Sequence, residues 1–242
     1  MRLTRVFVPG PLASGTRLTI AGSAANHITR VLRLRSGDPL TVFDGSGGEF
    51  SARLAEFRRD TVLVSVAEHH AVERESPLSL TLLQGVSRGE RMDWVIQKAT
   101  ELGATRIVPV LTSRSVVRLD ETQAQRKLQH WRGIAIAACE QCGRNRIPEV
   151  PAPRDFLAAL APEPAVTRLL LSPAGERRIE ALEGIGAGIS VLIGPEGGLE
   201  DAEQEAALAA GFTAVRLGPR VLRTETAAVA ALTIIQGHFG DL

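Results

Sequence analysis

The last two-thirds of the sequence restrict the fold most, because short apolar runs alternate there with amphipathic stretches. The pattern predicts strands over 78–86, 106–111, 168–171, 189–193 and 214–217, and helices over 91–102, 122–142, 201–210 and 226–239. Strands that alternate with helices form a parallel sheet that is covered on both faces. This part of the chain is therefore predicted to be an α/β domain.

The first part of the chain has a different pattern, of short strands joined by turns. Strands are expected over 5–8, 17–20, 40–43, 49–57 and 61–67, with turn residues at 9–11, 36–39 and 44–48. This pattern predicts a small β-barrel. A charged, turn-prone stretch over 69–77 suits an exposed connection, so we expect domains at 1–72 and 73–242.

A short helix is expected over 27–34, between the predicted strands. Its apolar residues have roughly helical spacing, which leaves Arg30, Arg33 and Arg35 to point elsewhere. These arginines form either a solvated face or a basic face for a nucleic acid. The formal net charge of the whole chain is only +1, so overall charge does not decide between the two.

No part of the sequence indicates a membrane or a secretion route. No apolar run approaches the length of a membrane span, and residues 1–5 lack the apolar stretch of a signal peptide. We therefore expect a cytoplasmic protein without a membrane partner.

The loop Ile193-Gly-Pro-Glu-Gly-Gly198 follows a fully apolar predicted strand and precedes a helix. Ligands of open parallel sheets gather where strands end and helices begin. The three glycines permit close approach of the backbone to a ligand, while Pro195 stiffens the turn. A tight structural turn would use the same residues. The spacing is neither a dinucleotide fingerprint nor a P-loop, which disfavours NAD and ATP.

A second unusual loop, Leu217-Gly-Pro-Arg-Val-Leu-Arg-Thr-Glu-Thr-Ala227, leads into the last predicted helix. Thr224 is expected to cap this helix, and backbone donors at such a terminus can meet a ligand. Arg223 and Glu225 flank the cap. They form either part of a site or a local ion pair.

The two loops together resemble the signature of the 16S rRNA uridine-N3 methyltransferase family, within the SPOUT class. Further blocks in the same order match the family and cover nearly the whole chain. They are Lys98-Ala-Thr-Glu-Leu-Gly103, Arg114-Ser115, Glu140-Gln-Cys-Gly-Arg144 with Ile147-Pro148, His27-Ile-Thr-Arg-Val-Leu-Arg-Leu34, Gly37-Asp38 and Asp44-Gly45.

The resemblance implies a fold, a cofactor and an assembly. The fold is a PUA-like β-barrel that holds RNA, followed by a SPOUT α/β domain with a parallel sheet and a trefoil knot, and family members are typically homodimers that share active-site residues. The cofactor is S-adenosylmethionine. Carried over position by position, the resemblance predicts these residues at its pocket: Leu171, Ser172, Ile193, Gly194, Pro195, Glu196, Gly197, Gly198, Leu217, Gly218, Val221, Leu222, Arg223, Thr224, Thr226 and Ala227.

The resemblance makes Arg114 and Arg144 candidates for contacting the RNA or the target base, and the chemistry of the reaction suggests further residues. Arg144, or Arg114 from the other subunit, would support negative charge on the target uridine, and Glu225 is the candidate proton acceptor. Arg30, Arg33 and Arg35 would grip 16S rRNA of the small ribosomal subunit.

One position departs from the family pattern. Cys142 stands where the family's Glu-Gln-Ser-Gly-Arg block has Ser, which puts in doubt a hydrogen bond from that side chain. Cys139 and Cys142 form a Cys-x-x-Cys without a second pair, so no metal site is expected, and two buried thiols are the default over a redox pair.

Two other functions fit parts of the sequence. A non-catalytic RNA-binding protein could have kept the cofactor pocket. The α/β alternation alone would also fit a nucleotide-dependent oxidoreductase, although its phosphate fingerprint is missing.

Overall fold

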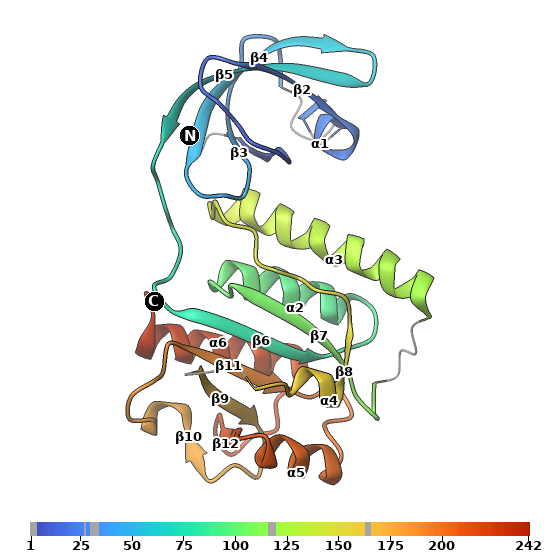
Figure 1. Ribbon diagram of the computed structural model, residues 1–242, viewed down its shortest axis with the longest axis vertical. Helices are drawn as coiled ribbons and strands as arrows, with labels where there is room; N and C mark the ends of the chain where they lie inside the picture. The colour runs from blue at the N-terminus through green and yellow to red at the C-terminus, as the bar shows by residue number, and fades with distance from the viewer. Residues whose placement is uncertain (1–3, 27, 30–33, 116–119, 163–165) are drawn as a thin grey trace. The chain divides into compact units, whose positions relative to one another are not determined.

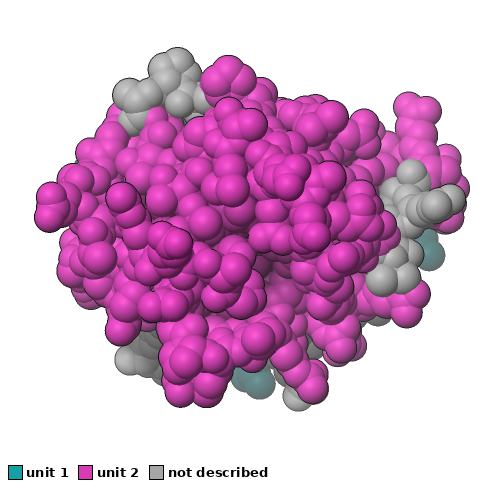
Figure 2. Space-filling model, turned by 90° about the horizontal axis from the view of Figure 1, so that it is seen from below, with its two compact units in different colours: residues 1–75, 139–147 teal, residues 76–138, 148–242 magenta. Residues whose placement is uncertain are grey.

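The computed structural model describes residues 4–26, 28–29, 34–115, 120–162 and 166–242. It divides into two compact units (Figure 2). The first unit comprises Met1–Glu75 and Cys139–Ile147, and the second comprises Ser76–Ala138 and Pro148–Leu242. The sequence pattern assigned the segment Cys139–Ile147 to the α/β domain. In the structure this segment belongs to the first unit, where Asn145 bonds to Arg5 and Arg144 bonds to Glu75.

The first unit contains a five-stranded sheet in the order β1-β3-β4-β5-β2 (Figure 1). Its strands lie where the sequence predicts them, to within a few residues at each end: β1 (Arg5–Phe7), β2 (Arg17–Ala21), β3 (Pro39–Phe43), β4 (Glu49–Arg58) and β5 (Thr61–His70). The β1–β3 pair is parallel and the others are antiparallel. The long β4–β5 hairpin has two register shifts, which bend and twist paired strands.

Alternating side chains of these strands build the core of the first unit. Val42, Leu54, Val62 and Val64 are at most 1% exposed and belong to one hydrophobic cluster. Helix α1 (Gly22–Asn26) contributes Ala25 to it. The predicted basic helix over 27–34 lies mostly outside the described residues.

The second unit contains a seven-stranded sheet in the order β10-β12-β9-β11-β6-β7-β8, and every adjacent pair is parallel. The strands are β6 (Ser79–Gly85), β7 (Arg106–Leu111), β8 (Arg154–Asp155), β9 (Val166–Leu171), β10 (Arg177–Arg178), β11 (Gly188–Ile193) and β12 (Thr213–Arg216). The predicted parallel sheet is confirmed. The two-residue edge strands β8 and β10 were not expected, since two residues carry no period.

Helices cover both faces of this sheet. On one face, α4 (Phe156–Ala159) and α5 (Asp201–Ala209) pack on Leu83, Val108 and Leu192 in one cluster. Neighbouring strand residues such as Leu82 and Val191 point the other way and are also fully buried.

Helices α2 (Glu90–Glu101) and α6 (Thr224–Phe239) pack against each other, and α6 also contacts β11. The remaining helices are α3 (Glu121–Cys142) and the 3₁₀ turn η2 (Ile179–Ala181). No helix among the described residues combines the length and apolarity that crossing a bilayer requires.

Arg168 shows how a charged residue can sit inside a strand of this domain. Its guanidinium donates to the carbonyl of Ala210 at 2.7 Å and of Leu160 at 2.9 Å, and it lies 4.1 Å above the ring of Phe212. Carbonyl groups at the ends of α4 and α5 carry partial negative charge, so the arginine joins both helices to β9.

Candidate functional site

Three loops leave the sheet of the second unit at the same edge. Strands β12, β9 and β11 are neighbours and parallel, so their carboxyl ends lie side by side. The loops that follow them are residues 172–175, 194–198 and 217–223. Such an edge is where open parallel sheets bind ligands.

These loops enclose a cavity of about 670 Å³, together with the start of α6. Every residue that the sequence assigned to a cofactor lines it except Thr226. The lining residues are Leu171, Ser172, Ile193, Gly194, Pro195, Glu196, Gly197, Gly198, Leu217, Gly218, Val221, Leu222, Arg223, Thr224 and Ala227. Residues far apart in the sequence thus meet in one place.

Glu225, the predicted proton acceptor, also lines the cavity. The sequence did not predict the other lining residues, which are Arg91, Leu170, Pro173, Ala174, Leu199, Gln204 and Arg220. A signal for Arg91 was present. The helix predicted from residue 91 follows a strand of the same sheet, so its first turn begins at the ligand-binding edge.

The glycine-rich loop 194–198 requires small residues at defined points. A side chain on Gly85, at the end of β6, would place its Cβ 2.5 Å from both the nitrogen and Cδ of Pro195. Gly198 has φ +69°, a conformation that other residues adopt at a cost, and its N–H donates to the Pro195 carbonyl at 2.9 Å. The turn is therefore tight and packed directly against the sheet.

Thr224 does not cap α6 in the predicted way. The helix begins at Thr224, and its N-cap is Arg223, which makes no side-chain capping bond. The Thr224 hydroxyl instead donates to the carbonyl of Gly194 at 2.7 Å. The sequence showed a residue suited to capping, but the neighbouring loop supplies a competing acceptor.

A charged cluster lies at one side of the cavity. Arg91 donates to Glu196 Oε1 at 2.8 Å, and its Nε lies 3.8 Å from Glu225 Oε1. Burial raises the pKa of Glu196, but its own N–H, the N–H of Arg88 and the guanidinium of Arg91 outweigh this and lower the pKa. Glu225 Oε2 is buried and has no hydrogen-bond partner among the described residues.

Arg114 touches the outside of the glycine-rich loop. It donates to the carbonyl of Gly197 at 3.0 Å, while half of its side chain remains exposed. The preceding residue fixes the loop that carries Arg114, since the N–H of Ser113 donates to Glu203 Oε1 at 2.8 Å. Arg114 is therefore next to the predicted pocket without lining it.

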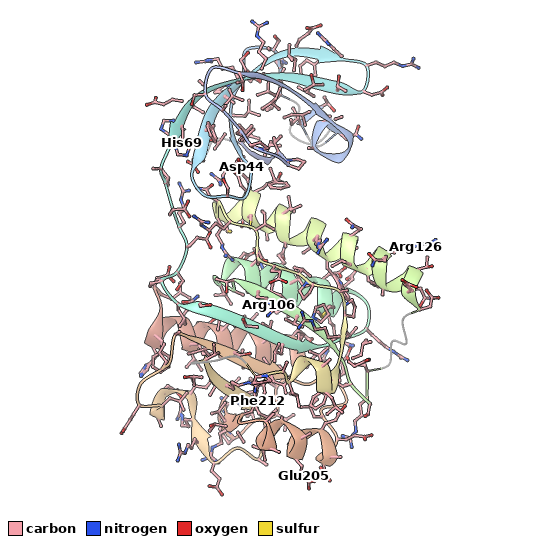
Figure 3. The ribbon with its side chains drawn as sticks, viewed as in Figure 1. Asp44, His69, Arg106, Arg126, Glu205 and Phe212 are labelled. Atoms are coloured by element: carbon pink, nitrogen blue, oxygen red, sulfur yellow. The ribbon has the colours of Figure 1, made fainter. Side chains whose placement is uncertain are left out.

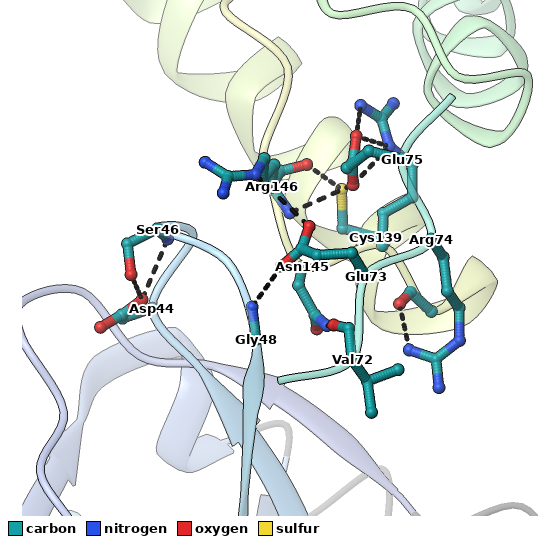
Figure 4. Close-up of polar contacts among 12 residues, drawn as sticks. Asp44, Ser46, Gly48, Val72, Glu73, Arg74, Glu75, Cys139, Asn145 and Arg146 are labelled. Carbon is teal, nitrogen blue, oxygen red and sulfur yellow. Dashed lines mark hydrogen bonds and ion pairs between the residues drawn. The ribbon is translucent and has the colours of Figure 1, made fainter. Parts of the chain in front are cut away.

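Arg144 belongs to the first unit, in the segment 139–147. Figure 4 shows Cys139, Asn145 and Arg146 of this segment together with Glu75. Only 3% of Arg144 is exposed, and its guanidinium donates to both carboxylate oxygens of Glu75, at 2.5–3.2 Å. Arg5 donates to the Asn145 side chain at 2.6 Å and pairs with Glu49. Arg144 is thus part of an arginine–carboxylate network.

The two cysteines lie at the end of α3, and both are free. Burial raises the pKa of Cys139 to about 12, so its thiol stays protonated at neutral pH. Its Sγ lies 3.5 Å from the carbonyl of Arg146, to which it donates. Cys142 is partly exposed, so the expectation of two buried thiols holds only for Cys139. No group of residues suited to a metal occurs in the described part of the chain.

Of the three predicted RNA-binding arginines, Arg30 and Arg33 lie outside the described residues. Arg35 is exposed, and its backbone N–H donates to Asp38 Oδ2 at 2.7 Å. Its side chain is therefore presented to solvent in a turn that Asp38 fixes.

Comparisons with known proteins also find two domains in this chain. An RNA methyltransferase domain matches residues 74–236, and an RNA methyltransferase PUA domain matches residues 20–67. Among solved structures, the ribosomal RNA small subunit methyltransferase E of Neisseria gonorrhoeae, bound to S-adenosyl methionine, is 36% identical with a TM-score of 0.92, and all of both chains is covered. A methyltransferase structure from Legionella pneumophila with bound SAM is 39% identical with a TM-score of 0.97, again over all of both chains.

The curated relatives point the same way. Ribosomal RNA small subunit methyltransferase E of Buchnera aphidicola is 33% identical over 100% of this chain and 98% of its own, and the enzyme of the same name from Bacillus subtilis is 34% identical over 90% and 88%. The expected fold class, a PUA-like domain followed by a SPOUT-class α/β domain, is confirmed. The chain belongs to the ribosomal RNA small subunit methyltransferase E family of S-adenosylmethionine-dependent RNA methyltransferases.

Proposed function

We propose that the protein transfers the methyl group of S-adenosylmethionine to N3 of a uridine in small-subunit ribosomal RNA. The observation that carries this proposal is the convergence of three loops on one cavity at the carboxyl edge of β9, β11 and β12. The chemistry of the cavity and the family of the chain support the same activity.

The cavity fits S-adenosylmethionine in size and chemistry. About 670 Å³ is typical of sites for cofactor-sized ligands. Apolar side chains such as Leu217 and Leu222 and the bare backbone of Gly194 and Gly197 line it, which suits a flat purine ring. Oε2 of Glu225 is buried and has no hydrogen-bond partner in the part of the chain that the structure describes, so it can accept from a donor inside the cavity.

When bound, S-adenosylmethionine supplies a methyl group on a positively charged sulfur, which N3 of the uridine attacks. The imide proton of N3 must leave before or during this attack, so the site needs a proton acceptor. Glu225 is our candidate, because it is a carboxylate in the first turn of α6 and it lines the cavity.

Loss of the proton leaves negative charge on the uridine oxygens, which guanidinium groups can stabilise. Arg114 is half exposed and beside Gly197, so its remaining donors can reach a substrate. Arg144 is already bonded to Glu75, and it would have to share its donors with the RNA. We therefore rank Arg114 above Arg144 for this role, acting from its own subunit or from the partner in a homodimer.

N3 lies on the Watson–Crick edge, so a paired or stacked uridine has to be exposed before transfer. We assign the grip on the surrounding RNA to the PUA-like first unit, through Arg30, Arg33 and Arg35. The proposal includes the trefoil knot that the resemblance implies, a homodimer, and a reaction in the cytoplasm.

Small ribosomal subunits that lack the modification, incubated with labelled S-adenosylmethionine, test the proposal. We expect label in a single nucleoside, 3-methyluridine, after digestion. Glu225→Gln should lower kcat at least ~100-fold at saturating cofactor. Glu205→Gln, on the exposed face of α5 (Figure 3), is the matched control and should retain full activity. Cofactor binding without any transfer would instead indicate a non-catalytic RNA-binding protein.

A second experiment separates the two units. Replacing Arg30 and Arg33 together by Ala should weaken RNA binding and reduce its salt dependence, while cofactor affinity measured by calorimetry stays unchanged. An equal loss of both affinities would contradict the assignment of RNA binding to the first unit.

A further inference from the structure

One fully buried polar side chain of the second unit lies directly behind the cavity. Gln84, the residue before the last of β6, has 0% exposure. It is in register with Ile193, the final residue of β11, from which the glycine-rich loop departs. Gln84 is not among the residues that line the cavity, so any effect on a ligand passes through its neighbours.

The Gln84 amide joins the two loops that form the cavity wall. Its Nε2 donates to Thr224 Oγ1 at 2.9 Å, and it lies 3.1 Å from the carbonyl oxygen of Gly85 and 3.4 Å from that of Gly194. Thr224 in turn donates to that same carbonyl at 2.7 Å. The first residue of the glycine-rich loop and the first residue of α6 are therefore fixed to each other by one hydroxyl and one amide.

The chemistry of Gln84 indicates that its donor matters. Its Oε1 is buried without a hydrogen-bond partner in the described part of the chain, which is unfavourable. A leucine of similar size would fill the same space without an unpaired polar atom. Because only Nε2 of this side chain forms hydrogen bonds among the described residues, the groups to which Nε2 donates best explain why a glutamine occupies this position.

The neighbouring residue independently supports the loop from the same side. Gly85 packs so closely that a Cβ there would lie 2.5 Å from the nitrogen of Pro195. The end of β6 thus holds the glycine-rich loop by a hydrogen bond at Gly194 and by direct backbone packing at Pro195. No part of this support depends on charge.

We propose that Gln84 is a positioning residue for the cofactor, which holds Gly194 and Thr224 at the separation that S-adenosylmethionine requires. This inference rests on the proposed function, because it concerns the same cavity. Without the amide, Thr224 and the glycine-rich loop lose a shared anchor and the wall can open. Small displacements of binding groups have large effects on affinity and rate.

Calorimetric titration of Gln84→Leu with S-adenosylmethionine tests the inference. We expect the dissociation constant to rise about tenfold, as for the loss of one buried hydrogen bond. At saturating cofactor, kcat should fall by less than the dissociation constant rises. A dissociation constant within twofold of the wild-type value would overturn the inference.

Gln236→Leu is the matched control. Gln236 is also a buried glutamine, 1% exposed, and its amide donates to the Leu102 carbonyl at 2.8 Å and accepts from Ser76. It lies on α6 twelve residues after Thr224, about 18 Å along the helix. We expect this variant to lose stability but to bind the cofactor like wild type. An equal loss of affinity in both variants would mean that Gln84 acts only through overall stability.

A double variant tests the route of the effect. If Gln84 acts through Thr224, then Gln84→Leu and Thr224→Val combined should weaken cofactor binding by less than the product of the two single effects. Multiplying effects would contradict the shared anchor. Should Gln84→Leu fail to fold, Gln84→Met replaces it with the same expectations. Failure of the wild-type protein to bind the cofactor would refute the proposed function itself, not the role of Gln84 alone.

Discussion

The wall of the cavity in the second unit and the segment 139–147 of the first unit are both irregular backbone that side chains hold in place, but they use different chemistry. Neutral groups fix the cavity wall, through Gln84, Thr224 and the close packing of Gly85. Ion pairs and charged hydrogen bonds fix the segment 139–147, through Arg144 with Glu75 and through Arg5, which pairs with Glu49 and donates to Asn145.

The difference follows from what each region has to tolerate. Neutral anchors behind the cavity add no charge to it. Its charged lining residues, Arg91 and Glu225, therefore set the electrostatic field that a ligand meets. A buried ion pair is stable only while both partners are present, since one left alone is an uncompensated charge. The network in the first unit should therefore be sensitive to single substitutions and to acid, and the cavity wall should be sensitive to shape.

The largest effect is expected from breaking the Arg144–Glu75 pair. The side chain of Arg144 is 4% exposed and that of Glu75 is 15% exposed, so Glu75→Ala leaves a buried guanidinium without its main partner. We expect the free energy of unfolding in urea to fall by about 3 kcal/mol. The double variant Glu75→Leu with Arg144→Met should recover much of this loss.

The exposed pair Arg178–Glu180 is the matched control, with side chains 61% and 36% exposed. Glu180→Ala should change the free energy of unfolding by less than about 1 kcal/mol. If Glu75→Ala were no worse than Glu180→Ala, the ion-pair network would not be what holds the segment 139–147.

The next effect is expected at the cavity wall. In Gly85→Ala the new methyl group meets the backbone of Pro195, which can move only with the glycine-rich loop. Overpacking of this kind costs about 1–3 kcal/mol, and we expect cofactor affinity in calorimetry to fall by roughly tenfold or more. Gly133→Ala on α3, whose Cβ would meet nothing within 4 Å, should bind normally and stabilise the helix slightly. Normal cofactor binding by Gly85→Ala would contradict a wall set by shape.

The smallest effect is a difference in acid sensitivity. Burial raises the pKa of Glu49, but hydrogen bonds from Arg74 and Arg5 outweigh it and lower the pKa below 4.5. A carboxyl group with a lowered folded-state pKa stabilises the protein above its unfolded pKa, and this contribution is lost as the pH falls through the folded value. Urea denaturation between pH 7 and pH 3 should therefore show a shallower loss of stability below about 4.5 in Glu49→Gln than in wild type. Parallel curves would show that Glu49 contributes no such acid sensitivity.

The sequence predicted the sheets and most of the cavity because both depend on local signals. Period-two runs and apolar blocks mark strands such as 189–193. The sequence Gly-Pro-Glu-Gly-Gly marks a loop, because it fits neither a strand nor a helix. It missed Arg91 and gave Thr224 the wrong role at the helix start, because these depend on which loop lies beside them.

By itself, the sequence determined where the backbone must turn and which side chains are apolar, since steric and solvation preferences act residue by residue. Only the tertiary structure decided the partners: Gln84 behind Thr224 and Gly194, and Glu75 with Arg144, pairs separated by 140, 110 and 69 residues. Hydrogen bonds and ion pairs act over a few ångströms. Which groups come within that distance depends on the packing of the whole domain, and no local pattern records it.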